Sequence, residues 1–199
     1  MTQSAEQELV KKAKAGDRAA FDSLVKSCAR DIYNFCLRLC RNREAAEDIA
    51  QEAFISAYKS IGGFEEKSPF KGWVYRIAVN AWKNRVRYEK RRFFSKHDSL
   101  DEAMETEEGG MQRQVADIRQ QPDMDAEKEM KKSAIHAALS GLSPDMRQMI
   151  VLRDMEELSY DEIAGVLRLP LGTVKSRIAR ARETLAEKLR ELKEGGENE

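Results

Sequence analysis

The sequence contains few of the residues from which metal and redox sites are built. Its 199 residues include three cysteines and two histidines, and neither His97 nor His136 has a second ligand at metal-site spacing. The odd cysteine count, without a C-x-x-C pair, argues against a disulfide framework and favours a reducing cytoplasm. No apolar run approaches the ~20 residues that span a bilayer, and residues 1–6 lack the features of a signal peptide. We expect a cytoplasmic protein without a metal or cofactor.

Sequence motifs of enzymes are missing as well. The chain has no glycine-rich phosphate loop, no H-E-x-x-H and no G-x-S-x-G. The spacing of Ser159 and Glu162 is that of a helix capping box, not of a catalytic pair. We therefore expect a protein that is not an enzyme.

β-Branched residues are scarce, and this indicates the fold class. Four threonines and nine valines stand against 23 alanines, a balance that favours helix over sheet. Proline occurs only four times. Ser68-Pro69 and Ser143-Pro144 each have the form of an N-cap followed by proline at the first helical position, and the other two prolines fall in a linker and a turn. The sequence predicts an all-α protein.

Apolar residues at helical spacing predict four helices in the first half of the chain. Gly16 is expected to end the first helix, Asp17 and Asn42 to cap the second and third, and Gly62-Gly63 to end the third. The fourth is expected to begin near Pro69. Cys36 and Cys40, four residues apart on an apolar stripe, are expected to behave as small apolar side chains. The sequence leaves open whether Cys28, Cys36 or Cys40 has a redox role.

The charge of the chain is unevenly distributed, although 35 basic and 35 acidic residues cancel. Residues 1–92 carry 19 basic and 12 acidic side chains, a net charge of +7. Residues 93–133 have a net charge of −5, few apolar residues and a Gly109-Gly110 pair, which predicts an extended or weakly helical linker. Residues 134–199 have a net charge of −2. We predict two small helical domains, 1–92 and 134–199, joined by an acidic linker over 93–133.

A basic cluster ends the first domain and follows an aromatic set. It comprises Lys83, Arg85, Arg87, Lys90, Arg91 and Arg92, with Trp73, Tyr75, Trp82 and Tyr88 before and within it. Cations hold phosphates, and aromatic rings stack on exposed bases of a single strand. A solvated helix face over buried tryptophans accounts for the same residues, so the cluster alone leaves both interpretations open.

A second basic cluster lies within a helix-turn-helix pattern. Ser159 would cap a short helix, residues 168–170 would form the turn, and a second helix would run from Leu171 to about Leu185. Val174 and Ile178 would face the first helix. The residues left facing outward, with no acid among them, are Lys175, Ser176, Arg177 and Arg180. Such a helix is suited to the major groove of DNA. Arg168 departs from the pattern, because many such turns have glycine there.

Four blocks together resemble the extracytoplasmic-function sigma factors, which are small two-domain specificity subunits of bacterial RNA polymerase. They are residues 46–54 (AEDIAQEAF), 70–80 (FKGWVYRIAVN), 158–164 (LSYDEIA) and 170–178 (PLGTVKSRI). They occur in the order and at the spacing of that family, and the resemblance covers nearly the whole chain. The block ending at Asn80, with Asn84, is similar to the envelope-stress sigma-E branch.

The resemblance implies roles for individual residues. Asp48, Gln51, Glu52 and Phe54 match the segment that docks on the clamp helices of the polymerase β′ subunit, and family members also contact the β flap. Residues matched to the −10 element are Phe64, Ser68, Trp73, Asn80, Lys83, Arg85 and Arg87. Asn80 would hold a flipped base and the loop with Phe64 and Ser68 would wall its pocket. The −35 element would be contacted by Thr173, Lys175, Ser176, Arg177 and Arg180. An anti-sigma factor, often membrane-bound, is a further implied partner.

Two of these assignments have an alternative that the sequence leaves open. Trp73 would stack at the melting fork or be buried in the core, and the helix with Asp48 would be a docking segment or a plain amphipathic helix. A stand-alone helix-turn-helix regulator and a helical scaffold are the rival functions. The pI of about 6.8 is low for a free-standing DNA-binding domain. We therefore predict weak DNA binding by the isolated chain.

Overall fold

The protein is helical throughout the part that the structure describes. The computed structural model describes residues 2–98 and 134–196, and no strand occurs among them. The helices are α1 (Gln3–Lys14), α2 (Arg18–Cys40), α3 (Arg43–Ser60), α4 (Phe70–Asp98), a helix over 134–140, α6 (Pro144–Ile150), α7 (Tyr160–Leu167) and α8 (Leu171–Gly196). A 3-10 turn, Ile61–Gly63, follows α3, and a π-helical turn, Val151–Met155, follows α6. The prediction of an all-α protein is confirmed. None of the described helices is long and apolar enough to cross a membrane.

The end of α1 and the starts of α2 and α3 lie where the sequence predicts, whereas α3 ends at Ser60, just before the predicted Gly62-Gly63. Gly16 has a φ of +95°, and its amide and that of Asp17 donate to the carbonyls of Ala13 and Lys12, which is a Schellman ending of α1. The Asp17 side chain accepts from the Ala20 amide and caps α2. Asn42 caps α3 in the same way, 2.8 Å from the Ala45 amide. These caps satisfy amides that the helices themselves leave unpaired.

The start of α4 differs from the prediction that Ser68 is its N-cap. The helix begins at Phe70, and the Pro69 carbonyl accepts the bond from the Trp73 amide. The Phe70 amide donates to Glu6 Oε1 of α1 at 2.8 Å. A carboxylate distant in sequence thus takes the role expected of the Ser68 hydroxyl, and it ties the loop before α4 to α1.

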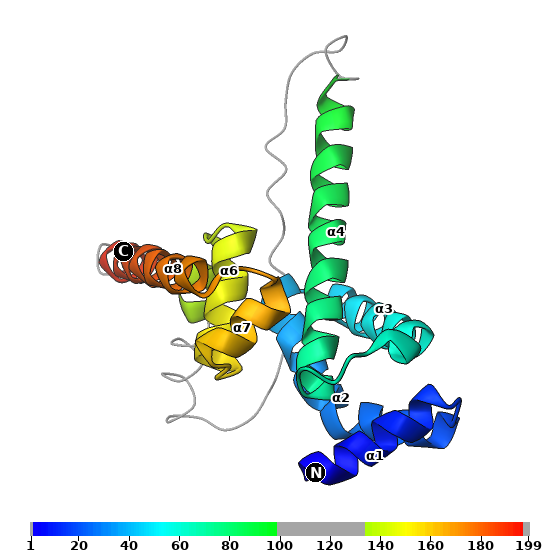
Figure 1. Ribbon diagram of the computed structural model, residues 1–199. Coiled ribbons are helices and arrows are strands. Elements are labelled where there is room, and N and C mark those ends of the chain that lie inside the picture. Colours follow the sequence, from blue (N-terminus) through cyan, green and yellow to red (C-terminus); the bar gives the residue numbers. More distant parts are fainter. Residues whose placement is uncertain (1, 99–133, 197–199) are drawn as a thin grey trace, which may run out of the picture.

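The helices α1–α4 share one apolar core. Phe35 of α2 lies at its centre, fully buried, with its ring edge against Tyr75 of α4 (centroids 4.8 Å apart). Cys28 and Cys36 are buried in the same core, and Cys40 is half-buried. The helix α4 continues beyond this core to Asp98 (Figure 1), past residue 92, where the sequence placed the end of the first domain. The remainder of the predicted linker, residues 99–133, lies outside the described residues.

The helices after residue 134 form a second packed group. Ser143 caps α6 with Pro144 as its first residue, as predicted. Ser159 and Glu162 form the predicted capping box of α7. The turn into α8 passes through Arg168, which is left-handed with a φ of 52°. This conformation is the reason that glycine is common there. Val174 and Ile178 of α8 are buried, so α7 and α8 are a helix-turn-helix.

The two groups of helices lie against each other. In Figure 1, α7 lies beside the first turns of α4, and the chain before α7 also contacts α2. Arg147 of α6 donates to the Leu39 carbonyl in the last turn of α2 at 2.9 Å. Since the last carbonyls of a helix have no partner within it, this arginine completes the end of α2 from the other group.

Candidate nucleic-acid interface

The second helix of the helix-turn-helix carries an exposed cationic face. Lys175, Arg177 and Arg180 are all exposed, and within residues 2–98 and 134–196 none has an acidic partner. Their order on α8 follows from Val174 and Ile178, which face inward four residues apart. Four of the predicted −35 residues, Lys175, Ser176, Arg177 and Arg180, are thus exposed on the part of α8 that is not packed against α7. Such a face matches the phosphates and guanine edges of a major groove.

Two polar side chains beside this face are held by the protein. Ser176 Oγ donates to the Thr173 carbonyl at 3.1 Å, and Thr173 itself is half-buried. Arg182 Nε donates to Asp154 Oδ2 at 3.2 Å, and this hydrogen bond raises the pKa of Arg182 further above its ordinary value. Arg182 thus ties α8 to the π-helical turn, and the available positive charge lies at Lys175, Arg177 and Arg180.

The cations predicted on α4 have individual partners. Arg85 donates to Asp48 Oδ2 at 3.2 Å and to Glu89 Oε1 at 3.0 Å. Lys83 Nζ lies 3.5 Å from Asp145 Oδ1 of α6, and Arg87 Nη1 donates to Asn84 at 3.4 Å. The pair of Arg85 and Asp48 joins a residue predicted for DNA to one predicted for polymerase. The sequence did not reveal it, because its members are 37 positions apart.

Asn80 is exposed on α4, between the buried Val79 and Ala81. Because residues at i, i+4 and i+7 lie on one face of a helix, Asn80, Asn84 and Arg87 face the same way. This face of α4 therefore presents two exposed amides and one cation.

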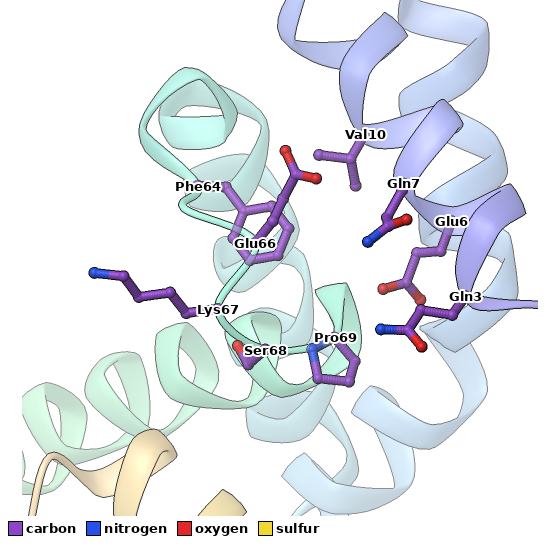
Figure 2. Close-up of a pocket in the computed structure, with 9 residues that line it drawn as sticks. All are labelled: Gln3, Glu6, Gln7, Val10, Phe64, Glu66, Lys67, Ser68 and Pro69. Atoms are coloured by element: carbon purple, nitrogen blue, oxygen red, sulfur yellow. The ribbon is translucent and has the colours of Figure 1, made fainter.

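The loop before α4 borders a cavity of about 420 Å³. Figure 2 shows its opposite wall, formed by Gln3, Glu6 and Gln7 of α1. Phe64 and Ser68 line the cavity, whereas the sequence placed them in one pocket with Asn80. Asn80 does not line it, and ten residues of helix, or about 15 Å, separate Asn80 from Phe70. The sequence did not indicate Gln3 and Gln7, since only the packing of α1 on this loop brings them there.

Trp73 and Phe64 are buried together. Trp73 is 6% exposed and Phe64 4%, and their rings stack with centroids 4.8 Å apart. Phe70 contacts both rings, with centroids 5.9 Å from Trp73 and 6.1 Å from Phe64. In this structure Trp73 is part of the core, the second of the two alternatives that the sequence left open.

The face predicted for polymerase is polar at its start and apolar further along. Asp48, Gln51 and Glu52 of α3 are exposed, and Phe54 is half-buried. Ile55 and Tyr58 follow, each 48% exposed. Neither of these two residues was expected at this face from the sequence. Both lie off the buried alanine stripe of α3, Ile55 about one turn and Tyr58 about two turns beyond Gln51, and this position is the sequence signal that could have found them.

The cysteines have the environment of core residues. Burial raises the pKa of each of the three thiols to about 12, so very little thiolate forms near neutral pH. Among the described residues, no group of three histidine, cysteine or acidic side chains is placed to hold a metal.

A two-part helical protein whose helix-turn-helix presents such a basic face belongs to the class of DNA-binding proteins. Comparison with known proteins identifies which family of DNA-binding proteins this is. Residues 24–92 match the family described as Sigma-70 region 2, and residues 132–185 match Sigma-70, region 4. The chain is 37% identical over 192 residues to the RNA polymerase sigma-H factor of Pseudomonas aeruginosa, covering 96% of this chain and 97% of that protein. It is 35% identical over 190 residues to the ECF RNA polymerase sigma-E factor of Escherichia coli, with the same two coverages. The chain belongs to the extracytoplasmic-function sigma factors of the sigma-70 family.

Solved structures agree with this assignment. The sigma factor RpoE in complex with the anti-sigma factor NepR from Bartonella quintana superposes with a TM-score of 0.62 at 25% identity, over 85% of this chain and 96% of that one. The fold also matches that of CnrH in complex with the cytosolic domain of CnrY, with a TM-score of 0.66 at 23% identity over 94% and 97% of the two chains. As a member of this family, the protein is a transcription initiation factor that acts with RNA polymerase and promoter DNA, and not an enzyme.

Proposed function

We propose that this sigma factor recognises the −35 element with residues 134–199 and melts the −10 element with residues 1–92, with residues 93–133 as the connector. The observation that carries the proposal is the face of α8 on which Lys175, Arg177 and Arg180 are exposed without acidic partners among the described residues. On this proposal α8 enters the major groove of the −35 duplex. Its cations donate to guanine edges and phosphates, and Thr173 and Ser176 contact the backbone beside them.

At the −10 element, Asn80 captures a base flipped out of the non-template strand. Flipping costs a few kcal/mol of stacking and pairing, which the captured base offsets. Arg87 lies two turns further along the same face, where it would hold the next phosphates, with Lys83 and Arg85 beside it. The cavity bordered by Phe64 and Ser68 is large enough for a nucleobase, and it would receive a base further along the strand. Trp73 supports this loop from beneath through its stacking on Phe64.

Polymerase binding is assigned to α3. The exposed Asp48, Gln51 and Glu52 would meet basic side chains of the β′ clamp helices, and Phe54 would pack beside them. The second domain would contact the β flap. Because polymerase acts in the cytoplasm, we place the protein there. We further propose that an anti-sigma factor, often membrane-bound in this family, holds the protein inactive and releases it under envelope stress.

Run-off transcription with core polymerase tests the proposal. Templates would carry promoters mapped from transcript starts after overexpression of the protein. Arg177→Ala should weaken promoter use by about 1–3 kcal/mol and relax the −35 preference at one position. Arg190→Ala is the matched control, because Arg190 is exposed on the same helix about 20 Å beyond Arg177. Unchanged promoter ranking in Arg177→Ala would make this arginine a phosphate contact only.

The −10 assignment needs a separate readout. Asn80→Ala should impair open-complex formation, measured by permanganate reactivity of unpaired thymines, while polymerase binding stays intact. Equal loss of both would give Asn80 a folding role instead.

The rival functions give different outcomes in the same assays. A stand-alone regulator would bind promoter duplex tightly without polymerase and fail to be retained by core polymerase. A helical scaffold would yield no transcript from any promoter.

A further inference from the structure

We propose that Glu156 latches the two domains into a closed form that keeps the free protein from engaging promoter DNA. The masking of DNA contacts in the closed form rests on the function proposed above, whereas the latch between the domains rests on the observed contacts alone. Glu156 lies between the π-helical turn and α7, and its side chain is only 8% exposed. Both of its carboxylate oxygens are held by the first domain.

The partners of Glu156 come from two different helices. Arg38 of α2 donates to Oε1, and it also donates to the Met155 carbonyl at 3.3 Å. Tyr75 of α4 donates its hydroxyl proton to Oε2 at 2.5 Å. Charge-assisted hydrogen bonds are the stronger ones, and a buried carboxylate that loses its partners carries a large desolvation penalty. One side chain thus joins the second domain to the two central helices of the first.

Further contacts around Glu156 hold the same arrangement. Arg147 donates to the Leu39 carbonyl at 2.9 Å. A groove of about 550 Å³ beside the latch has Lys67, Lys71 and Arg76 on the first-domain side. The residues on its other side include Glu157, Asp161 and Glu162. The acidic start of α7 therefore faces a basic part of the first domain, where a phosphate backbone would be attracted.

The closed form is incompatible with binding both promoter elements at once. Elements near −35 and −10 are about 25 base pairs apart, which is about 85 Å of straight duplex. Two domains of this size, each with a radius of gyration of about 13 Å, span about 70 Å or less when they touch. Lys83, a proposed −10 contact, is paired with Asp145 in the closed form. The domains must therefore separate before the promoter is bound.

Distance measurement by pulsed electron resonance tests the latch in the full chain. Spin labels would be attached through Lys59→Cys on α3 and Arg190→Cys on α8, both exposed positions. Cys28 and Cys36 are buried and would stay unlabelled, and the half-buried Cys40 would be replaced by alanine. We expect one narrow distance in the otherwise unchanged protein. Glu156→Gln, and Arg38→Gln from the other domain, should each broaden and lengthen it.

Glu183→Gln is the matched control. It removes the same charge at an exposed position of α8 in the same domain, outside the groove beside the latch, and it should leave the narrow distance unchanged. The latch is overturned if Glu156→Gln and Arg38→Gln keep the narrow distance, if only one of them loses it, or if Glu183→Gln loses it as well.

A second measurement separates the latch from the proposed function. Binding of the same proteins to a fluorescent single strand with the −10 sequence should strengthen roughly tenfold in Glu156→Gln, if about nine in ten molecules are closed. A longer distance with unchanged affinity would overturn the masking of DNA contacts. If the distance lengthens but no variant binds DNA or supports transcription, the proposed function fails while the latch stands.

Discussion

Replacing Trp73 distinguishes its two possible roles, a stacking platform for DNA and a support for the loop before α4. The side chain is 6% exposed and stacks on Phe64 with 4.8 Å between ring centroids. Trp73→Ala removes nearly the whole ring from this packing. It leaves Phe64 and Phe70 facing the space that the indole had filled.

The expected loss of stability follows from this geometry. A buried tryptophan replaced by alanine costs about 3–5 kcal/mol, and the lost ring pair accounts for about 0.5–1.5 kcal/mol. We expect the upper part of that range, about 4–5 kcal/mol. For a domain of about 100 residues, such a loss lowers the melting temperature by at least about 15 °C.

Urea denaturation followed by far-UV circular dichroism measures this loss in the full chain. Tyr88→Ala is the control on the same helix. Its ring is 60% exposed, so its removal should change the free energy of unfolding by no more than about 0.5 kcal/mol. The reasoning is refuted if Trp73→Ala stays within about 1 kcal/mol of the unchanged protein and loses only promoter melting. That outcome would mean that the indole faces DNA in solution.

Two further changes test other features. Arg168→Gly should raise the free energy of unfolding by up to about 1 kcal/mol. The reason is that Arg168 has a left-handed φ of 52°, a conformation that costs an L-residue roughly 1–2 kcal/mol and glycine much less. If urea denaturation shows that Arg168→Gly is destabilised, the arginine side chain makes a compensating contact. Alkaline pH should weaken the fold, because burial, followed by the charges of Cys40 and Glu156, raises the pKa of Cys36 from 9.0 to about 12. The unfolded chain releases this proton first, so the stabilisation is complete below pH 9 and is lost between pH 9 and about 12. Between pH 9 and 10 the titration of Cys36 should lower the free energy of unfolding by about 1 kcal/mol. In Cys36→Ala the free energy of unfolding should therefore fall by about 1 kcal/mol less over this pH interval. An equal fall in the two proteins would contradict the prediction.

Features set by neighbouring residues could be predicted from the sequence, and features set by distant ones could not. Asp17, Asn42 and Ser159 cap helices through bonds to amides three residues ahead, so local spacing reveals them. The helix-turn-helix was predictable for the same reason. The N-cap expected at Ser68 was wrong because Glu6, 64 positions away from Phe70, takes that bond.

Pairings between helices had no sequence signal at all. Glu89 is the one acid near Arg85 along the chain, and only folding brings Asp48 of α3 to Arg85 as a second partner. The buried Glu156 looks like one more acid in a run of charged residues until Arg38 and Tyr75 are seen around it. Long-range pairs of this kind depend on how the helices dock, which the apolar pattern leaves undetermined.

The length and continuity of α4 give it a mechanical role. It is one helix of 29 residues, about 44 Å long, and Trp73 and Trp82 are buried in its first half. These anchors fix its rotation about its own axis, so they also set the direction in which Arg87 and Arg91 face. One residue inserted after Trp82 would turn every later side chain by about 100° and advance it by about 1.5 Å. Seven inserted residues would nearly restore the direction while moving the cations about 10 Å outward. The packing of α4 in the hydrophobic core therefore determines the direction in which the basic side chains at its other end face.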